Sequence, residues 1–175
     1  DSGAVHLWRD ATLYASNNVT FEENTADDDA GAISRQGATP DGAPVLKLEG
    51  KVVFVRNSAK DRGGAVFVIG RCFVEVIGDV EFVQNVALDD GGAISMERSS
   101  SSGDGTLSIE GAAVFRENEA KSYGGSLYLR DVEWTKIGGG VVFEKNHGNF
   151  AGGAIVVFSS PLLLVSDVHF VDNAA

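Results

Sequence analysis

The chain has 175 residues, of which 43% are hydrophobic and 22% charged, a composition that indicates one folded domain with its own core and excludes a disordered chain. The formal net charge of −11 argues against nucleic acid and anionic membrane surfaces as partners, because like charges repel. The single cysteine, Cys72, excludes an internal disulfide, and no apolar run approaches the ~18 residues that a transmembrane segment needs.

The chain is built from one repeated unit, whose parts follow each other in a fixed order. The first unit opens at Gly3, continues through the alternating apolar residues Leu13 and Ala15, and ends at Phe21. Apolar residues at every second position indicate β-strands. We therefore predict three short strands in each unit: one after the glycine, one in the middle and one that ends at the Phe.

Each unit closes with the motif Phe-x-x-Asn, which occurs six times. Successive Phe residues are separated by 33, 28, 33, 28 and 27 positions. The six motifs are Phe21/Asn24, Phe54/Asn57, Phe82/Asn85, Phe115/Asn118, Phe143/Asn146 and Phe170/Asn173. A glycine follows ten residues after each of the first five Phe residues, at Gly31, Gly64, Gly92, Gly125 and Gly153. These constant distances predict that equivalent residues occupy equivalent places in a repeating structure.

Three short strands in each unit of about 28 residues are typical of one coil of a parallel β-helix, in which coils stack about 4.8 Å apart. We predict an all-β solenoid of about six such coils over residues 1–175, as a single β-helix segment. A β-propeller is the alternative, but its blades use four strands and about 40–45 residues. Since neither end of the chain shows a polar cap, we expect the segment to belong to a longer solenoid or to be covered by partners.

Stacked coils give the repeated residues structural roles. The six Phe positions are predicted to form one interior aromatic stack. The six Asn positions are predicted to form a ladder, because an amide carries both a donor and an acceptor and can bond to the next coil.

The segments FVRNSAKDRGGAV (54–66) and FVQNVALDDGGAI (82–94) resemble the Phe-x-x-Asn and Gly-Gly-Ala-Ile/Leu/Val repeats of the polymorphic outer membrane protein family, whose best-known members are chlamydial surface autotransporters. The resemblance extends over all six units. It implies a right-handed parallel β-helix of the pectin lyase-like kind, exported to the cell surface or the extracellular space. It also implies a role in adhesion or as a structural scaffold.

We expect a non-catalytic structural or adhesive rod, whose partners are other protein chains, further coils of the same chain, or cell-surface or carbohydrate ligands. One alternative is a subunit of an extracellular fibre or filament. Another is a carbohydrate-active lyase or hydrolase, which would need clustered carboxylates on an outward sheet face. The two outward positions predicted in the strand after each glycine offer no such acid pair. The first outward residues are His6, Ser34, Phe67, Ser95, Tyr128 and Val156, and the second are Trp8, Gln36, Ile69, Glu97, Arg130 and Phe158.

An apolar contact face is predicted among these outward positions, since exposed apolar patches often mark contact surfaces. Its residues are Trp8, Phe67, Ile69, Val156 and Phe158. The competing interpretation is a scatter of single surface hydrophobic residues, which needs no function.

Three further features are candidates for binding or modification. Asp28, Asp61 and Asp89 occupy equivalent positions in consecutive coils, about 5 Å apart, and could bind Ca²⁺, although solvated turn charge is the favoured interpretation. No other cofactor is expected. Asn18 begins an Asn-Val-Thr glycosylation sequence. Two longer loops, at 35–44 and 98–105, are predicted to protrude from one edge.

Overall fold

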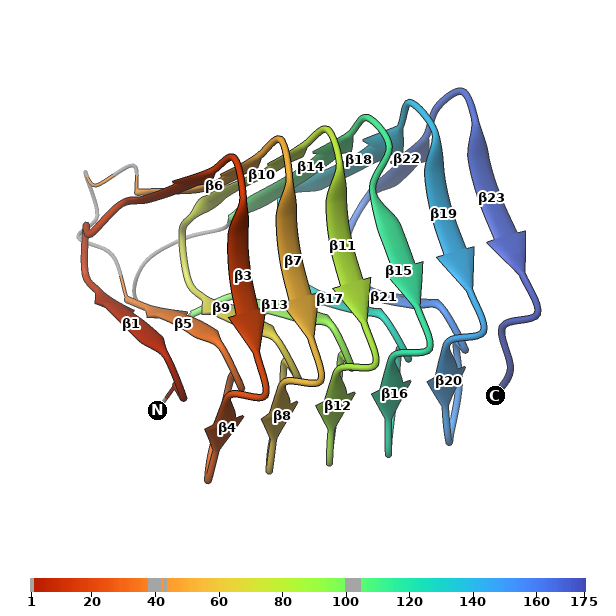
Figure 1. Cartoon of the computed structure of the whole chain (residues 1–175), viewed down its shortest axis with the longest axis horizontal. Coiled ribbons are helices and arrows are strands. Elements are labelled where there is room, and N and C mark those ends of the chain that lie inside the picture. The colour runs from red at the N-terminus through yellow and green to blue at the C-terminus, as the bar shows by residue number, and fades with distance from the viewer. Residues whose placement is uncertain (1, 38–41, 43, 100–104) are drawn as a thin grey trace.

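The computed structural model of the chain describes residues 2–37, 42, 44–99 and 105–175. The secondary structure of these residues consists of β-strands that wind into a parallel β-helix, with coils that follow one another along the long axis (Figure 1). The prediction of an all-β parallel solenoid of about six coils is therefore confirmed. Much of the two longer loops falls outside the described residues.

Each coil contributes one strand to each of sheets A to D, except that sheet D ends one coil earlier. Sheet A contains β1 (Val5–Trp8), β5 (Ile33–Gln36), β9 (Val66–Ile69), β13 (Ile94–Glu97), β17 (Leu127–Arg130) and β21 (Ile155–Phe158). Sheet B contains β2 (Leu13–Ser16), β6 (Val45–Glu49), β10 (Phe73–Ile77), β14 (Thr106–Glu110), β18 (Trp134–Gly138) and β22 (Leu162–Leu164). Sheet C contains β3 (Val19–Glu22), β7 (Val52–Val55), β11 (Val80–Val83), β15 (Val114–Arg116), β19 (Val141–Glu144) and β23 (Val168–Val171). Sheet D contains β4 (Thr25–Ala26), β8 (Ser58–Ala59), β12 (Val86–Ala87), β16 (Glu119–Ala120) and β20 (His147–Gly148).

Sheet D is a difference from the sequence prediction, which gave each unit three strands and none after the Asn. The residue before the Asn turns the chain with a positive φ, as Gln84 does at 54°. The two residues after the Asn, such as Val86 and Ala87, then run parallel to the neighbouring coil, and the Val86 amide donates to the Asn57 carbonyl at 2.9 Å. Two residues are too few to show an alternation of apolar and polar side chains, so the pattern could not reveal this strand.

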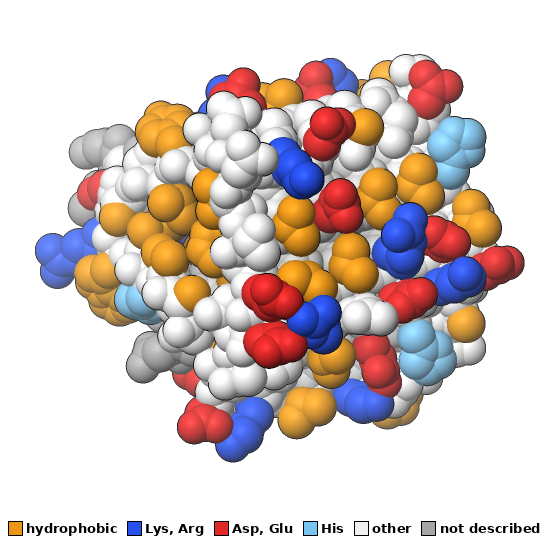
Figure 2. Space-filling model, viewed as in Figure 1, with side chains coloured by type: hydrophobic (Ala, Val, Ile, Leu, Met, Phe, Trp, Pro, Cys, Tyr) orange, Lys and Arg blue, Asp and Glu red, His pale blue; other side chains and the backbone are white. Residues whose placement is uncertain are grey.

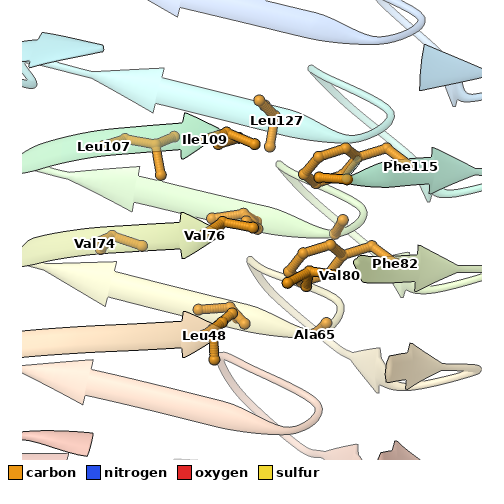
Figure 3. Packing of buried hydrophobic residues seen from close by; sticks show 14 of the residues in the cluster. Leu48, Ala65, Val74, Val76, Val80, Phe82, Leu107, Ile109, Phe115 and Leu127 are labelled. Atoms are coloured by element: carbon orange, nitrogen blue, oxygen red, sulfur yellow. The ribbon is translucent and has the colours of Figure 1, made fainter. Parts of the chain in front are cut away.

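The interior is filled by apolar side chains that stack in register between coils. Phe82 lies between Phe54 and Phe115, with ring centroids 4.7 and 4.8 Å away and the planes nearly parallel. Figure 3 shows Phe82 and Phe115 among side chains from sheets A and B, such as Leu127 and Ile109. Complete burial of a Phe contributes about 2–3 kcal/mol to the stability of the fold. The constant spacing from Phe to Asn to glycine thus specifies the register, and the register builds the core.

The Asn side chains form a continuous hydrogen-bonded ladder beside the Phe stack. The Asn85 Oδ1 accepts hydrogen bonds from the Asn57 backbone amide (3.1 Å) and from its Nδ2 (2.9 Å). In turn, the Asn85 Nδ2 donates to the Phe54 carbonyl and to the Asn118 Oδ1, both at 3.0 Å. Each interior Asn is buried and satisfies polar groups of the coils on both sides.

Asn146 continues the same pattern near the other end of the ladder. Its Oδ1 accepts hydrogen bonds from the Asn118 backbone amide and from the Asn118 Nδ2, both at 3.0 Å. Its Nδ2 donates to the Phe115 carbonyl at 2.9 Å and to the Asn173 Oδ1 at 2.8 Å. Like Asn85, Asn146 is completely buried and is bonded to the coils on both of its sides.

The six residues of the Phe stack, and likewise the six of the Asn ladder, are not equivalent, which is a difference from the sequence prediction. Phe170 is 47% exposed although its ring lies 5.1 Å from that of Phe143, because no further coil follows it among the described residues. The two end members of the ladder, Asn24 and Asn173, are only partly buried. Spacing alone could not distinguish them from the completely buried interior members, Asn57, Asn85, Asn118 and Asn146.

One charged residue lies inside this core. Arg35 occupies the inward position that Val68 and Met96 fill in the next two coils, and it is completely buried. Its Nη2 donates to the Arg9 carbonyl, but Nε and Nη1 have no hydrogen-bond partner among the described residues. Burial raises the pKa of the nearby Cys72 thiol to about 11, so this thiol stays neutral and supplies no counter-charge.

We expect the substitution Arg35→Met to raise the free energy of unfolding by about 1–3 kcal/mol, because it removes a poorly compensated buried charge and keeps much of the volume of the side chain. Among the described residues, the carboxylate of Asp10 attracts the guanidinium. Urea denaturation would measure the change, with the exposed Lys51→Met as a control for the gain in hydrophobicity. A lower stability of the Arg35→Met variant would contradict this account.

Candidate functional site

The ladder residues, which the sequence singled out most clearly, are structural and offer no binding surface. The amides of Asn57, Asn85, Asn118 and Asn146 are completely buried and already hold hydrogen bonds to neighbouring coils. A ligand could reach them only by separating the coils. A functional site must therefore lie on the outer surface, where the coils differ from one another.

The turn that leaves sheet D folds over the outer face of sheet A. The turn lies so close to the sheet that a Cβ added to Gly91 would be only 2.5 Å from the Ile94 carbonyl oxygen on β13. In the next coil, the ring of Tyr123 lies 6.5 Å from that of Tyr128 on β17. Outward residues near the start of these strands are therefore covered, and the side chain of Ser95 is buried.

This covering turn corrects the predicted apolar contact face. Phe67 is only 1% exposed, because the Arg62 guanidinium from the turn lies 4.6 Å above its ring. Trp8 and Phe158 are exposed, at 58% and 43%, but they belong to the first and the last strand of sheet A. Ile69 and Val156 are partly buried. The five side chains do not make one exposed apolar face.

The face over sheet C is also mixed in character. Figure 2 shows hydrophobic side chains there in separate groups, interspersed with charged ones. Ion pairs connect neighbouring coils on this face, with Arg56 contacting Glu22 and Glu23, and the Arg116 Nε lying 2.9 Å from the Glu144 carboxylate. Such exposed pairs each contribute about 0–1 kcal/mol. This face therefore offers no extended apolar surface to a partner.

The acidic turn residues come together in part as predicted. The Asp61 amide donates to the Asp28 carbonyl and the Asp89 amide to the Asp61 carbonyl, so the three positions are equivalent in consecutive coils. The carboxylates that lie within 4.8 Å of one another are those of Asp28, Asp61 and Asp29. Asp89 does not belong to this group, and Asp29 was missed because it is one position further along the turn.

A cation from the chain itself already lies at this acidic group. The Arg62 Nε is 3.2 Å from the Asp29 carboxylate and 3.5 Å from that of Asp61, and its Nη1 is 2.9 Å from Glu97. Burial raises the pKa of the Asp29 carboxyl, an effect that the charge of Arg62 opposes. Calcium binding by these residues remains a prediction, and the ion would compete with Arg62.

A recess lined by aromatic and charged side chains lies further along the same face, over β17 and β21. Tyr128 is buried and forms its floor, with the ring of Phe158 5.8 Å away. The Tyr123 ring stands almost perpendicular to that of Phe158, at an angle of 89° and a centroid distance of 5.8 Å. Phe150, from the following turn, lies 5.9 Å from Tyr123 and is largely exposed. The recess has a volume of about 390 Å³.

Polar groups complete the recess at the end of the two strands. Arg130, Asp131 and Ser159 line it together with three of the rings. The Arg130 Nε lies 3.9 Å from the Asp131 carboxylate. Burial, together with the charges of Asp90 and Glu97, raises the pKa of the Tyr128 hydroxyl, which therefore stays neutral. The recess thus combines ring faces with hydrogen-bond donors and acceptors.

Asp90 is a further carboxylate that alternation did not place on this face, because it arrives from the covering turn. Its side chain is buried and accepts a hydrogen bond from the Tyr123 amide at 3.0 Å. Burial raises the pKa of Asp90 to about 6, and the negative charges of Asp89 and Glu97 act in the same direction. The negative charges of Asp90 and Glu97 both raise the pKa of the Tyr128 hydroxyl, so these two carboxylates lie near the floor of the recess.

We expect Asp90→Asn to stabilise the protein at neutral pH. The folded-state pKa lies above the unfolded value of 3.8, so the wild-type stability is greatest when Asp90 is protonated and falls as pH rises through about 6. The amide keeps an oxygen for the Tyr123 amide, and the gain at pH 7 should be about 1–2 kcal/mol. Urea denaturation between pH 4 and 7 would measure it, with the exposed Asp79→Asn as control. An unchanged pH dependence in the Asp90→Asn variant would refute this assignment.

The predicted glycosylation residue lies apart from the recess, at the corner between sheets B and C. Asn18 is exposed and has a φ of 63°, and its amide donates to the Lys51 carbonyl at 2.8 Å. Its side chain is thus accessible, and its modification remains a prediction.

The fold and its outer face define a class of protein: a parallel β-helix whose outer surface changes from coil to coil around a repeated interior. Residues 18–34, which contain the first Phe-x-x-Asn motif and the Gly-Ala-Ile that follows it, match the model of the Chlamydia polymorphic membrane protein repeat. The suspected repeat family is thereby confirmed for this unit. No curated protein and no solved structure matches the chain. No helix among the described residues is long and apolar enough to cross a membrane.

Proposed function

We propose that the chain is a non-catalytic structural rod of a cell-surface or secreted protein and that it mediates adhesion through the outer face of sheet A. The observation that carries the proposal is the match of residues 18–34 to a repeat of polymorphic membrane proteins, which supports a surface location in general. The repeated Phe and Asn residues are occupied by packing and hydrogen bonds inside the coils. Recognition is therefore left to positions that differ between coils, and the aromatic recess is one of these.

Two measurements test this proposal. Antibodies against the folded chain should label intact cells of the source organism, and external protease should remove the label. Beads coated with the chain should adhere to cultured cells more strongly than beads coated with a β-helix that lacks the recess. Labelling only after permeabilisation would refute the surface location, and equal adhesion of the two bead types would refute the adhesive role.

Catalysis is the second candidate, since Asp90 and Glu97 bring two carboxylates to one outer face. We favour binding because Arg62 pairs with Glu97, and the Tyr123 amide donates to Asp90, so both acids already have partners. Incubation with uronate-containing and neutral polysaccharides should release no reducing ends. Release that disappears in the Asp90→Asn and Glu97→Gln variants would establish a lyase or hydrolase instead.

A further inference from the structure

We infer that the aromatic recess over β17 and β21 binds a neutral saccharide, with the flat C–H face of one pyranose ring against Phe158 and the edge of the sugar towards Tyr123. This inference rests on the proposed adhesive function, and it adds the chemical class of the ligand. The volume of about 390 Å³ lies within the range of about 300–1,000 Å³ that is usual for small-molecule sites.

The rings provide the apolar part of the recognition. Aromatic faces are electronegative, and the C–H groups of a pyranose carry a partial positive charge, so the two surfaces attract each other. Phe158 is 43% exposed and can receive a ligand without displacing other side chains. The edge-to-face contact with Tyr123 and the underlying Tyr128 hold the Phe158 ring in place. The site is therefore preorganised, which lowers the entropic cost of binding.

The polar groups match the hydroxyls of a sugar. Each hydroxyl both donates and accepts a hydrogen bond, so its site needs partners of both kinds. Arg130 supplies donors and Asp131 supplies acceptors, and their charged groups are 3.9 Å apart, which leaves both accessible to a ligand. Ser159 adds a hydroxyl that can act in either way.

The charges of the recess indicate that the ligand is neutral. Anionic sugars are disfavoured by Asp131, by the nearby Asp90 and Glu97, and by the formal net charge of −11. Aromatic rings beside carboxylates can also bind organic cations. Here, however, the Arg130 guanidinium lines the recess and would repel a cation. A neutral polyol with one apolar face fits both restrictions.

Saturation-transfer NMR and calorimetric titration of the full chain would test this inference. The neutral probes are the methyl glycosides of glucose, galactose, mannose and N-acetylglucosamine, with glucuronate as the anionic probe and choline as the cationic one. We expect at least one neutral glycoside to bind, with the strongest saturation transfer at its ring C–H protons. Phe158→Ala should weaken binding at least tenfold, and Asp131→Asn should weaken it several-fold.

Trp8→Ala is the matched control, since it removes an exposed aromatic ring from the same sheet on the first strand, and it should leave binding unchanged. Unchanged melting curves would show that Phe158→Ala retains the fold. The inference is overturned if no neutral glycoside binds, if glucuronate or choline binds as tightly, or if Phe158→Ala has no effect. Should coated beads still adhere to cells although no glycoside binds, the saccharide inference falls and the adhesive function stands.

Discussion

Replacement of a middle Asn of the ladder, Asn85→Leu, is expected to lower the free energy of unfolding by about 3–5 kcal/mol. The side chain takes part in four hydrogen bonds, with the Asn57 amide and Nδ2, the Phe54 carbonyl and the Asn118 Oδ1. Leucine can replace none of them, and the groups that remain are buried and cannot reach water. Urea denaturation would measure the loss, and hydrogen exchange should locate it at the Asn57 amide.

The first member of the ladder provides a matched control. Asn24 donates one side-chain hydrogen bond, from its Nδ2 to the Asn57 Oδ1 at 2.8 Å. Its backbone amide also donates to this oxygen, at 3.1 Å, and would still do so in Asn24→Leu. The cost of Asn24→Leu should therefore be only about 1 kcal/mol. Equal losses in the two variants would mean that the ladder is not the source of the stability.

The substitution Gly92→Ala should be comparably damaging, for a steric reason. A Cβ at this position would lie 2.2 Å from the Gly125 carbonyl oxygen and 2.6 Å from the backbone of Glu119. These atoms belong to the next coil, so the new methyl group would have to force two coils apart. We expect a loss of about 3 kcal/mol or more, at the upper end of the range for overpacked sites. Thermal unfolding would measure it, and the protection of the Gly92 amide, which donates to the Gly124 carbonyl, should fall.

Gly37→Ala separates this steric effect from the conformational effect of losing a glycine. Gly37 has a φ of 68°, where an alanine is strained, but no atom lies within 4 Å of its added Cβ. Its substitution should cost about 1 kcal/mol. If Gly37→Ala proved as harmful as Gly92→Ala, close packing between coils would not explain the repeated glycine.

Most of the interior of the protein could be predicted from the sequence because the spacing of the repeated residues sets the register between coils. A constant distance from Phe to Asn to glycine is enough to place Phe82 above Phe54, and Gly64 against the carbonyl of Gly92. The outer face could not be predicted in the same way. The alternation of apolar and polar residues predicts which side of its strand Phe67 occupies. It does not predict that the turn before this strand, which contains Arg62, will cover that side.

The recess was missed for the same reason, although the sequence contained a signal. Asp28, Asp61 and Asp89 are followed at the equivalent positions of the next coils by Ser122 and Phe150. This change from acidic to aromatic turn residues marks where the covering turns become a ring-lined site. Tyr123 meets Tyr128 and Phe158 only once its turn is folded over the sheet, and Phe150 from the next turn then lies against Tyr123.

The Asn ladder gives the solenoid a direction and a natural unit of change in length. Every interior Oδ1, from Asn57 to Asn146, accepts from the preceding coil, and every interior Nδ2 donates to the following one, so the amides all point the same way. Removal or duplication of the residues from one Phe to the next would join identical surfaces and leave each amide satisfied. A deletion or insertion in the segment from a Phe to the following glycine, whose length is constant in the first five units, would bring a wrong residue into the ladder. Such a protein can be lengthened or shortened by recombination between its own repeats, provided that the exchange always comprises a whole coil.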